Sequence, residues 1–321
     1  MFKNRITKML NITYPIIGGT MMRITTPKFT ADISNAGGLG ILASAMYQSR
    51  ESFTDAIDQV QNLTDHPFAV NINLFPMIRP IDNKEYVDVL IEKGVKIVET
   101  SGHSAPEHLC ARFKEAGLIW IHKCVGIKYA LKVQGLGAHI ITAVGYENGG
   151  ATGEMDIGTM VLVPRVAESI KVPVIGGGGV SDGRGFLAVL ALGAEGVIVG
   201  TRLLTTQEAP IHPDLKKALL QACELDTMLV MRSIGGTHRV WVNTAAKRCA
   251  EMEANQADLP KILSIVAGDK AQKMYDKGDL DAGIISCGQG VGLAHNIPTV
   301  KELFQGIIAQ ATDIAKKLSM N

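Results

Sequence analysis

The sequence has few aromatic residues, no long run of one charge and no long apolar run. Aromatic residues make up 5% of the 321 positions, whereas glycine occurs 34 times. This composition suits a buried parallel sheet with many tight turns between strands and helices. The formal net charge is +1, so the charge distribution gives no reason to expect binding to nucleic acid or to an anionic membrane.

Cysteine is also scarce, and its pattern excludes two kinds of structural site. The five residues are Cys110, Cys124, Cys223, Cys249 and Cys287, and none of them forms a C-x-x-C pair. An odd number without such pairs argues against a disulfide framework or a zinc site, and no metal is expected. The first residues lack the apolar core of a signal peptide, and no stretch is long enough to span a bilayer. We therefore expect a cytoplasmic protein without membrane insertion.

Short apolar runs recur along the first two thirds of the chain, with little polar alternation. Such runs are typical of strands that are covered on both faces. The predicted strands are 15–18, 39–43, 68–72, 95–100, 118–123, 138–143, 172–176 and 196–200. Helical spacing separates them, at 26–35, 50–62, 86–93, 106–116, 129–135, 161–170 and 183–192. Thr26 is a candidate N-cap with Pro27 at the first helical position. The alternation predicts parallel β/α units.

Eight such units fit either a closed barrel or an open doubly wound sheet. An open nucleotide-binding sheet usually carries its glycine fingerprint after the first strand. Here the glycine-rich turns follow the seventh and eighth strands, where α/β barrels commonly bind phosphate. We therefore predict an α/β fold, a (β/α)8 TIM barrel.

After the eighth strand the pattern changes to helices without strands, at 213–223, 245–253 and 259–266. We predict a helical lobe inserted before a last barrel helix at 300–318. The predicted division is a barrel at 1–206, a lobe or lid at 207–280, and a covering loop with the C-terminal barrel helix at 281–321.

The strongest motif is a strand that ends in four glycines, Gly176–Gly179, followed by Ser181 and Asp182 at the start of a helix. The next strand ends in Gly200 and Thr201. Bare glycines let backbone N–H groups approach an anion, and a helix N-terminus favours negative charge. The sequence therefore predicts a phosphate site at these two turns. The alternative is that the glycines only permit tight turns, with Ser181 or Asp182 as an N-cap.

Other strand ends carry candidate ligand-binding residues. Small residues after the first strand would let a planar ring lie against the backbone, or they form only a simple βα turn. Asn71 offers a donor and an acceptor to a ring, or to its own loop. Lys123 is expected to face a ligand, because a buried unpaired lysine is costly. A glycine-rich loop, 144–154, follows the sixth strand and is a candidate active-site loop. The alternative is a flexible loop without a chemical role.

These residues carry a resemblance to a known family. The chain resembles the nitronate monooxygenase-like flavoproteins, which include NADH:quinone reductases and FMN-dependent enoyl-acyl-carrier-protein reductases. The matching segments are 15–21, 68–74, 98–102, 122–124, 145–154, 172–185, 192–202, 231–233 and 286–290. The segments 231–233 and 286–290, with the DGRG at 182–185, look most similar to the NADH:quinone reductase branch.

The resemblance implies a TIM barrel that binds FMN. By transfer of positions, Gly19, Thr20 and Met21 would flank the isoalloxazine ring, and Asn71 and Lys123 would contact its polar edge. The remaining implied cofactor contacts are Gly149, Gly150, Gly177, Gly178, Gly179, Gly200 and Thr201, with Gln289 and Gly290 closing the far side. NADH or NADPH is the implied co-substrate.

The chain departs from the family at one position. The strand-six loop of the family normally carries a histidine where this sequence has Ala151. Alanine transfers no proton, so the catalytic residue is unknown; Tyr146, Glu147 and Thr152 are the local candidates for proton donation.

The leading hypothesis is that NAD(P)H reduces FMN, and FMN reduces a quinone-like or other conjugated acceptor, because hydride transfer needs orientation more than a protein base. The alternatives are a nitronate monooxygenase that uses O2, a reductase or dehydrogenase of enoyl thioesters or related carbonyl compounds, and a non-catalytic flavin-binding protein. The expected partner is a small-molecule substrate, and a homodimer is one possible assembly.

Overall fold

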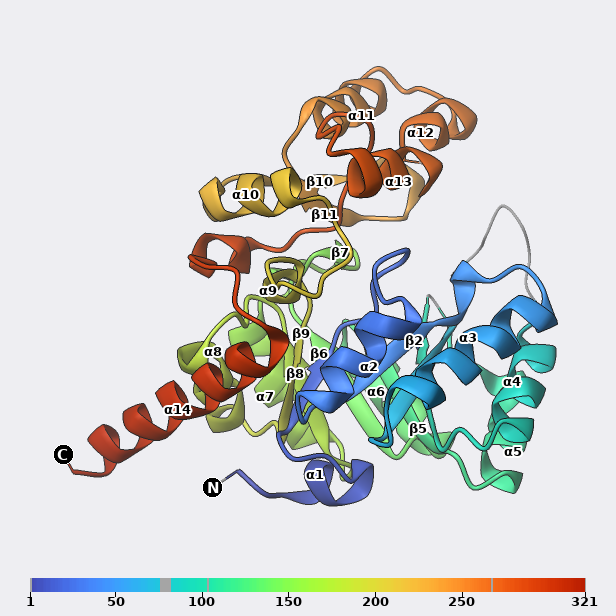
Figure 1. Ribbon diagram of the computed structural model, residues 1–321, viewed down its shortest axis with the longest axis vertical. Coiled ribbons are helices and arrows are strands. Elements are labelled where there is room, and N and C mark those ends of the chain that lie inside the picture. The colour runs from blue at the N-terminus through green and yellow to red at the C-terminus, as the bar shows by residue number, and fades with distance from the viewer. Residues whose placement is uncertain (1, 76–81, 103, 267, 321) are drawn as a thin grey trace.

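Eight parallel strands form a single sheet that curls into a barrel (Figure 1). The computed structural model describes residues 2–75, 82–102, 104–266 and 268–320. The barrel strands are β1 (Ile16–Gly18), β2 (Gly40–Ala43), β3 (Phe68–Asn73), β4 (Ile97–Ser101), β5 (Ile119–Cys124), β6 (Ile140–Val144), β8 (Val174–Gly177) and β9 (Gly196–Val199). Their order is β1-β9-β8-β6-β5-β4-β3-β2, and a parallel bridge between Ile17 and Leu39 joins the two ends. All eight predicted strands and the predicted barrel are confirmed.

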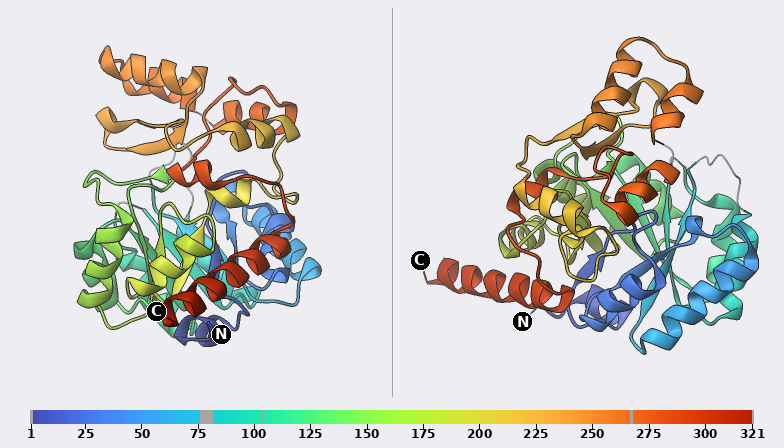
Figure 2. Two further views of the ribbon diagram at one scale, coloured as in Figure 1. Left: turned by 90° about the vertical axis from the view of Figure 1, so that its left-hand side faces the viewer. Right: turned by 45° about the horizontal axis from the view of Figure 1, so that its top comes forward.

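The interior of the barrel is apolar at the end where the strands begin. One residue from each strand enters a common cluster: Ile17, Ile41, Ala69, Ile97, Ile121, Ile140, Ile175 and Ile198. Ile6 and Leu10 of α1 (Arg5–Leu10) join the same cluster and are almost completely buried. Figure 2 shows α1 beneath the barrel, at the end opposite the lobe. This helix fills the amino end, so polar chemistry is confined to the carboxyl ends of the strands.

Helices cover the outer face of the barrel, as the alternating pattern predicts. They are α2 (Pro27–Asn35), α3 (Arg50–Leu63), α4 (Asn83–Glu92), α5 (Glu107–Glu115), α6 (Ile127–Gly135), α7 (Thr159–Ser169), α8 (Gly183–Ala191) and α14 (Val300–Ser319). The Thr26 side chain accepts a hydrogen bond from the Phe29 N–H, so the predicted cap of α2 is present. A second and larger apolar cluster lies between these helices and the outward faces of the strands. The helices thus hold the strand ends, and the loops that follow them, in fixed positions.

The lobe contains strands as well as helices, and the prediction of helices alone was wrong. Its elements are α10 (Pro213–Gln221), β10 (Thr227–Val230), η2 (Arg232–Ile234), β11 (His238–Trp241), α11 (Thr244–Ala254), α12 (Leu259–Val266) and α13 (Gly268–Lys277). Strands β10 and β11 pair antiparallel. Val230 and Val240 bury one face of this hairpin against Ala246 and Cys249 of α11. This packing stabilises the hairpin. Its two strands have four residues each and were not recognised from the sequence.

A barrel loop completes the sheet of the lobe. The loop after β6 contributes β7 (Gly150–Ala151), which pairs antiparallel with β11. The segment that returns to the barrel also pairs there, through a bridge between Val240 and Ser286. The lobe sheet therefore draws on residues outside the predicted 207–280 segment, and it places β11 directly over the mouth of the barrel (Figure 1).

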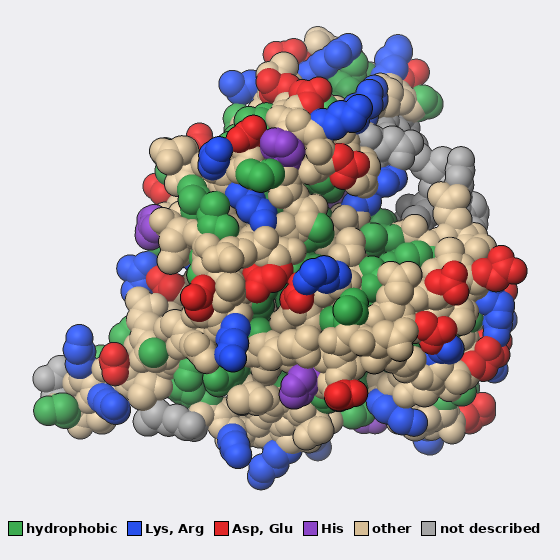
Figure 3. Space-filling model, in the orientation of Figure 1, with side chains coloured by type: hydrophobic (Ala, Val, Ile, Leu, Met, Phe, Trp, Pro, Cys, Tyr) green, Lys and Arg blue, Asp and Glu red, His purple; other side chains and the backbone are tan. Residues whose placement is uncertain are grey.

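The face of the molecule drawn in Figure 3 carries charges of both signs. Figure 3 shows basic and acidic side chains interspersed over this face of the barrel and the lobe. Across the described ranges, no helix combines the length and the apolar character needed to cross a bilayer.

Candidate active site

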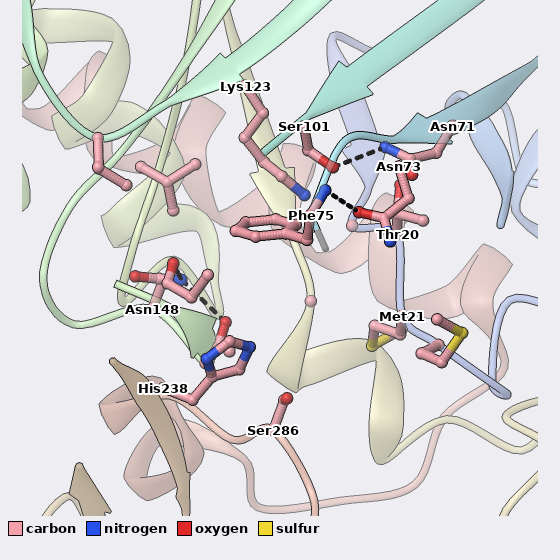
Figure 4. A pocket seen from close by; sticks show the side chains of 18 of the residues that line it. Thr20, Met21, Asn71, Asn73, Phe75, Ser101, Lys123, Asn148, His238 and Ser286 are labelled. Atoms are coloured by element: carbon pink, nitrogen blue, oxygen red, sulfur yellow. Dashed lines mark hydrogen bonds between the residues drawn. The ribbon is translucent and has the colours of Figure 1, made fainter. Parts of the chain in front are cut away.

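A cavity of about 1310 Å³ lies at the carboxyl end of the barrel, beneath the lobe. The loops after β1, β3, β5, β6, β8 and β9 line it, together with residues of the lobe sheet (Figure 4). Enzymes with this fold place their active sites at this end. A site for one small molecule usually has about 300–1,000 Å³. The cavity is therefore large enough for a cofactor and a second molecule.

Two loops present backbone N–H groups at one end of the cavity. Gly178 and Gly179 have φ angles of +106° and +72°, which favour glycine, and Gly200 precedes the short helix α9 (Thr201–Leu204). Within the described parts of the chain, the N–H groups of these glycines and of Thr201 donate no hydrogen bond. A Cβ atom on Gly200 would meet no atom within 4 Å, so its α-carbon faces open space. This anion cup, Gly178–Gly179 with Gly200–Thr201, suits a phosphate.

The first two glycines of the motif have a different role. Gly176 and Gly177 belong to β8 and do not line the cavity. A Cβ atom added to Gly176 would lie 2.4 Å from the Val189 side chain. A Cβ atom added to Gly177 would lie 2.3 Å from the Ile198 side chain. These two glycines let β8 pack closely against α8 and against the neighbouring strand β9, whereas the anion cup begins one residue later.

Glycines also bring the loops on both sides of the cup into contact. A Cβ atom on Gly19 would lie 3.3 Å from the α-carbon of Gly200, and one on Gly149 would lie 2.7 Å from the Gly288 nitrogen. Gly19, Thr20 and Met21 line the cavity on the β1 side, and Gly149 and Gly150 line it on the β6 side. The missing side chains at Gly19 and Gly149 therefore let these loops pack against the neighbouring backbone at the edge of the cavity.

The segment 286–290 closes the cup from the lobe side. The Thr201 hydroxyl accepts a hydrogen bond of 2.8 Å from the Gly288 N–H, and the Ser181 hydroxyl donates one of 2.8 Å to the Gly290 carbonyl. Gly290 lines the cavity. Gln289 does not; its N–H donates to the Glu147 carbonyl at 2.9 Å, which fixes the segment against the β6 loop.

A polar cluster occupies the mouth of the barrel. Asn71 and Glu99 are direct neighbours on β3 and β4, and the Asn71 amide donates to Glu99 Oε2 at 2.7 Å and to the Ser101 hydroxyl at 3.1 Å. The Thr20 hydroxyl donates to the same Glu99 oxygen at 2.7 Å. Both amide hydrogens of Asn71 are thus used, which leaves its carbonyl oxygen to accept from a ligand.

Lys123 extends this polar cluster across the cavity. It lies opposite Ser101 in the β4–β5 register, and Figure 4 shows its side chain pointing into the cavity. None of the described residues forms a hydrogen bond or ion pair with its amine. A cation held there suits the polar edge of a ring that gains electrons.

The three local candidates for proton donation are placed differently. Glu147 lines the cavity, but its carboxylate accepts from the Thr159 N–H at 3.0 Å and from the Thr159 hydroxyl at 2.7 Å, and so caps α7. The Tyr146 ring lies under the Arg239 guanidinium, 4.5 Å from its carbon, and Thr152 is buried. Neither Tyr146 nor Thr152 lines the cavity.

Burial removes two other cavity groups from proton transfer near neutral pH. His122 accepts or shares a hydrogen bond of 2.8 Å with the Thr100 hydroxyl, and burial lowers its pKa to about 4. Burial likewise raises the pKa of the Cys124 thiol to about 12. Met21, an implied cofactor contact, lines the cavity as expected, and Met22 lines it as well. Within the described residues, no group of three or more His, Cys, Asp or Glu side chains could hold a metal ion.

Two residues of the site were missed by sequence reasoning. Glu99 is fully buried and organises Thr20 and Asn71; a carboxylate within a predicted buried strand was the available signal. His238 lines the cavity from β11. No sequence signal placed it there, because the strand itself was not predicted.

An α/β barrel with an anion cup after β8 and β9 and a polar cluster at its mouth fits a flavin-dependent oxidoreductase. The family profile described as nitronate monooxygenase matches residues 3–86 and 74–310. The chain belongs to the nitronate monooxygenase family.

Individual relatives extend over almost the whole chain. A (3aS,4S,5R,7aS)-5-hydroxy-7a-methyl-1-oxo-octahydro-1H-indene-4-carboxyl-CoA dehydrogenase of Rhodococcus jostii is 32% identical, covering 96% of each chain. A probable nitronate monooxygenase of Staphylococcus aureus is 30% identical over 97% of this chain and 98% of its own. The solved structure of FabK from Thermotoga maritima has a TM-score of 0.91 and 33% identity, covering 99% of this chain and 98% of its own.

Proposed function

We propose that this protein is an FMN-dependent oxidoreductase in which NADH or NADPH supplies electrons and a quinone-like or other conjugated acceptor receives them. The observation that carries the proposal is the shape of the cavity. One end of the cavity is the anion cup, beside the backbone of Gly19 and Gly149. The remaining volume extends beneath the lobe, where a second molecule has room. A site that alternates between two co-substrates requires this combination.

The residues present fit FMN. The N–H groups of Gly178, Gly179, Gly200 and Thr201 would hold its phosphate. The space beside the α-carbon of Gly200 is open, and a Cβ atom there would obstruct the phosphate. The Asn71 carbonyl would accept from the ring, and the Lys123 amine would approach its polar edge. When bound, FMN supplies two-electron redox chemistry between a nicotinamide and an acceptor.

The protein contributes orientation and charge to this reaction. Gly19 and Gly149, which line the cavity, would lie beside the bound cofactor, and lobe residues such as His238 line the cavity from the opposite side. A positive charge at Lys123 stabilises the negative charge that a ring gains on reduction. Hydride transfer depends mainly on such positioning, so the reductive half of the cycle tolerates Ala151.

Two alternatives follow from the names of the relatives. The probable nitronate monooxygenase of S. aureus supports oxidation of a nitronate with O2, and the CoA dehydrogenase of R. jostii supports a thioester or related carbonyl substrate. The proposed similarity to the NADH:quinone reductase branch is the reason for placing the quinone-like acceptor first.

Anaerobic reduction of the purified holoprotein separates these functions. We expect NADH or NADPH to bleach the flavin absorbance, and a quinone to restore it. Bleaching by a nitronate and not by NAD(P)H would support the monooxygenase. Reoxidation by an enoyl thioester and not by a quinone would support the thioester reaction. Bleaching by none of these would overturn the proposal and favour a non-catalytic flavin-binding protein.

The homodimer and the cytoplasmic location stay predictions. All five cysteines are unpaired in the structure, which is compatible with a reducing compartment.

A further inference from the structure

We propose that His238 of the lobe is the proton donor to the acceptor, replacing the imidazole that the strand-six loop lacks. This inference rests on the proposed function, because it assigns a residue to the second half of that reaction. It also moves the proton-transfer group from the barrel loop to the lobe.

The register of the lobe sheet places His238 at the right position. His238 lies directly opposite Ala151 in the antiparallel pair of β11 and β7, whereas Arg239 lies opposite Gly150. Directly opposed residues point to the same face of a sheet, with Cβ atoms about 4.5–5.5 Å apart. An imidazole at 238 therefore occupies the space that a histidine at 151 would enter from the neighbouring strand.

Both members of this pair face the cavity. Ala151 and His238 line it, as do Asn148 and Ser286. Figure 4 shows the His238 ring beside Asn148 and near Ser286, across the cavity from Lys123 and Asn71. The ring thus stands on the lobe side of the cavity, where the acceptor has room, and opposite the polar cluster of the barrel.

A hydrogen bond fixes which ring nitrogen exchanges the proton. His238 Nδ1 lies 2.6 Å from the Gly236 carbonyl oxygen. A carbonyl only accepts, so Nδ1 carries a hydrogen in both charge states. The proton that is gained and lost is therefore the one on Nε2. This contact also orients the ring, as partners of catalytic imidazoles commonly do.

Four other titratable groups around the cavity are less suited to the role. Glu147 caps α7, burial lowers the pKa of His122 to about 4, and burial raises the pKa of the Cys124 thiol to about 12. Burial also raises the pKa of the Tyr275 phenol far above neutrality. Imidazole is the side chain whose ordinary charge change falls between pH 5 and 8.

The proposed step is balanced with a nicotinamide as the reductant. For a quinone, one carbonyl oxygen takes the Nε2 proton of the His238 imidazolium, and the quinone gains a hydride equivalent that originates from NAD(P)H. The products are the hydroquinone, NAD(P)+ and neutral His238. The imidazole then regains a proton from solvent.

The test compares the two half-reactions in four forms of the holoprotein: wild type, His238→Gln, the exchange variant Ala151→His/His238→Ala, and His108→Gln. His108 is exposed on α5 and does not line the cavity, so its variant is the matched control. Anaerobic stopped flow measures flavin bleaching by NADH and reoxidation by duroquinone. Fluorescence titration measures FMN binding, a readout independent of turnover.

We expect His238→Gln to bind FMN and to be bleached by NADH within about twofold of wild type. Reoxidation should be about 100-fold slower, the lower end of the usual contribution of a positioned acid. The exchange variant should be reoxidised at least tenfold faster than His238→Gln, and His108→Gln should be reoxidised at the wild-type rate. Reoxidation of His238→Gln within twofold of wild type would overturn the inference.

A second measurement uses the wild-type holoprotein and does not depend on the folding of a variant. With 15N-labelled histidine, the His238 ring should show the Nδ1–H tautomer, and its Nε2 signal should shift when duroquinone is added to the oxidised protein. An unchanged signal at saturating duroquinone would contradict the proposal. If NAD(P)H fails to bleach the wild-type flavin, the proposed function itself fails; if only the His238 effects are absent, this inference alone fails.

Discussion

The amide nitrogen of Asn71 lies 2.7 Å from Oε2 of Glu99, its direct neighbour on the adjacent strand. Because the carboxylate can only accept, this contact settles which end of the Asn71 amide faces the cavity. Asn71 presents an acceptor there, and Glu99 determines that choice without facing the cavity itself.

The first prediction concerns this pair. Asn71→Ala removes the acceptor toward the ring and leaves Glu99 without one of its donors. We expect FMN to bind about tenfold more weakly, which corresponds to about 1.4 kcal/mol. Fluorescence titration of the apoprotein measures the dissociation constant. Asn62→Ala, at an exposed position of α3, is the control. Equal affinity in the Asn71 and Asn62 variants would remove Asn71 from the site.

The second prediction separates binding from stability at the anion cup. A Cβ atom on Gly200 meets no protein atom within 4 Å, and its φ of −114° suits any residue. Gly200→Ala should therefore leave the melting temperature of the apoprotein almost unchanged but weaken FMN binding at least tenfold, because the methyl group enters the space assigned to the phosphate. Gly306→Ala is the control, because Gly306 also has open space around it but lies on α14, away from the cavity. Unchanged FMN affinity in Gly200→Ala would place the phosphate elsewhere.

The third prediction uses the charge of Lys123. Lys123→Met removes a cation from the cavity, so the reduced flavin loses a stabilising charge. We expect the two-electron midpoint potential to fall by about 30 mV or more, the equivalent of about 1.4 kcal/mol. Dye-coupled redox titration measures the potential. Lys128→Met, at an exposed position of α6, should leave it unchanged. A potential that rises in the Lys123 variant contradicts this role.

The fourth prediction concerns pH and follows from a buried hydrogen-bond chain. The Trp120 indole donates to the Thr100 hydroxyl at 2.7 Å, and the same hydroxyl shares a hydrogen bond of 2.8 Å with His122 Nδ1. Burial lowers the pKa of His122 to about 4. The unfolded chain, with an ordinary imidazole, binds more protons between about pH 6.5 and 4 than the folded protein does. Stability is therefore complete above about pH 6.5 and is lost as the pH falls below it.

Urea unfolding at pH 7.5 and pH 5 measures this effect. We expect His122 to account for about 2 kcal/mol of the stability lost between the two pH values. His122→Asn should show a correspondingly smaller loss, and His66→Asn, at an exposed position, should behave as wild type. The same pH dependence in His122→Asn and wild type would show that the imidazole is not the cause.

The barrel could be predicted from the sequence because its signals are local. Each strand is a short apolar run, and each helix has its own periodicity or cap, as Thr26 and Pro27 show for α2. The position of the anion cup, the proposed phosphate site, could be predicted from glycines at the ends of two adjacent strands. These features depend on residues that are close together in the chain.

The lobe sheet could not be predicted because its signals are distant. Strands β10 and β11 have four residues each, and β7 has two, so none carries a recognisable period. The pairing of His238 with Ala151 joins segments that are far apart in the sequence. Glu99 was missed for a related reason: the significance of a buried carboxylate depends on Thr20 and Asn71, which reach it from other strands.

The contribution of β7 to the lobe sheet has a consequence for protein engineering. A chimera that exchanges residues 207–280 between two members of the family would keep the host Gly150 and Ala151 but replace the strand that pairs with them. The residue at 151 and the residue at 238 would then come from different parents. If the second parent carried its imidazole at 151 and not at 238, the cavity would receive two imidazoles or none. Lobe exchange in this family therefore needs the β6 loop to be transplanted together with the lobe.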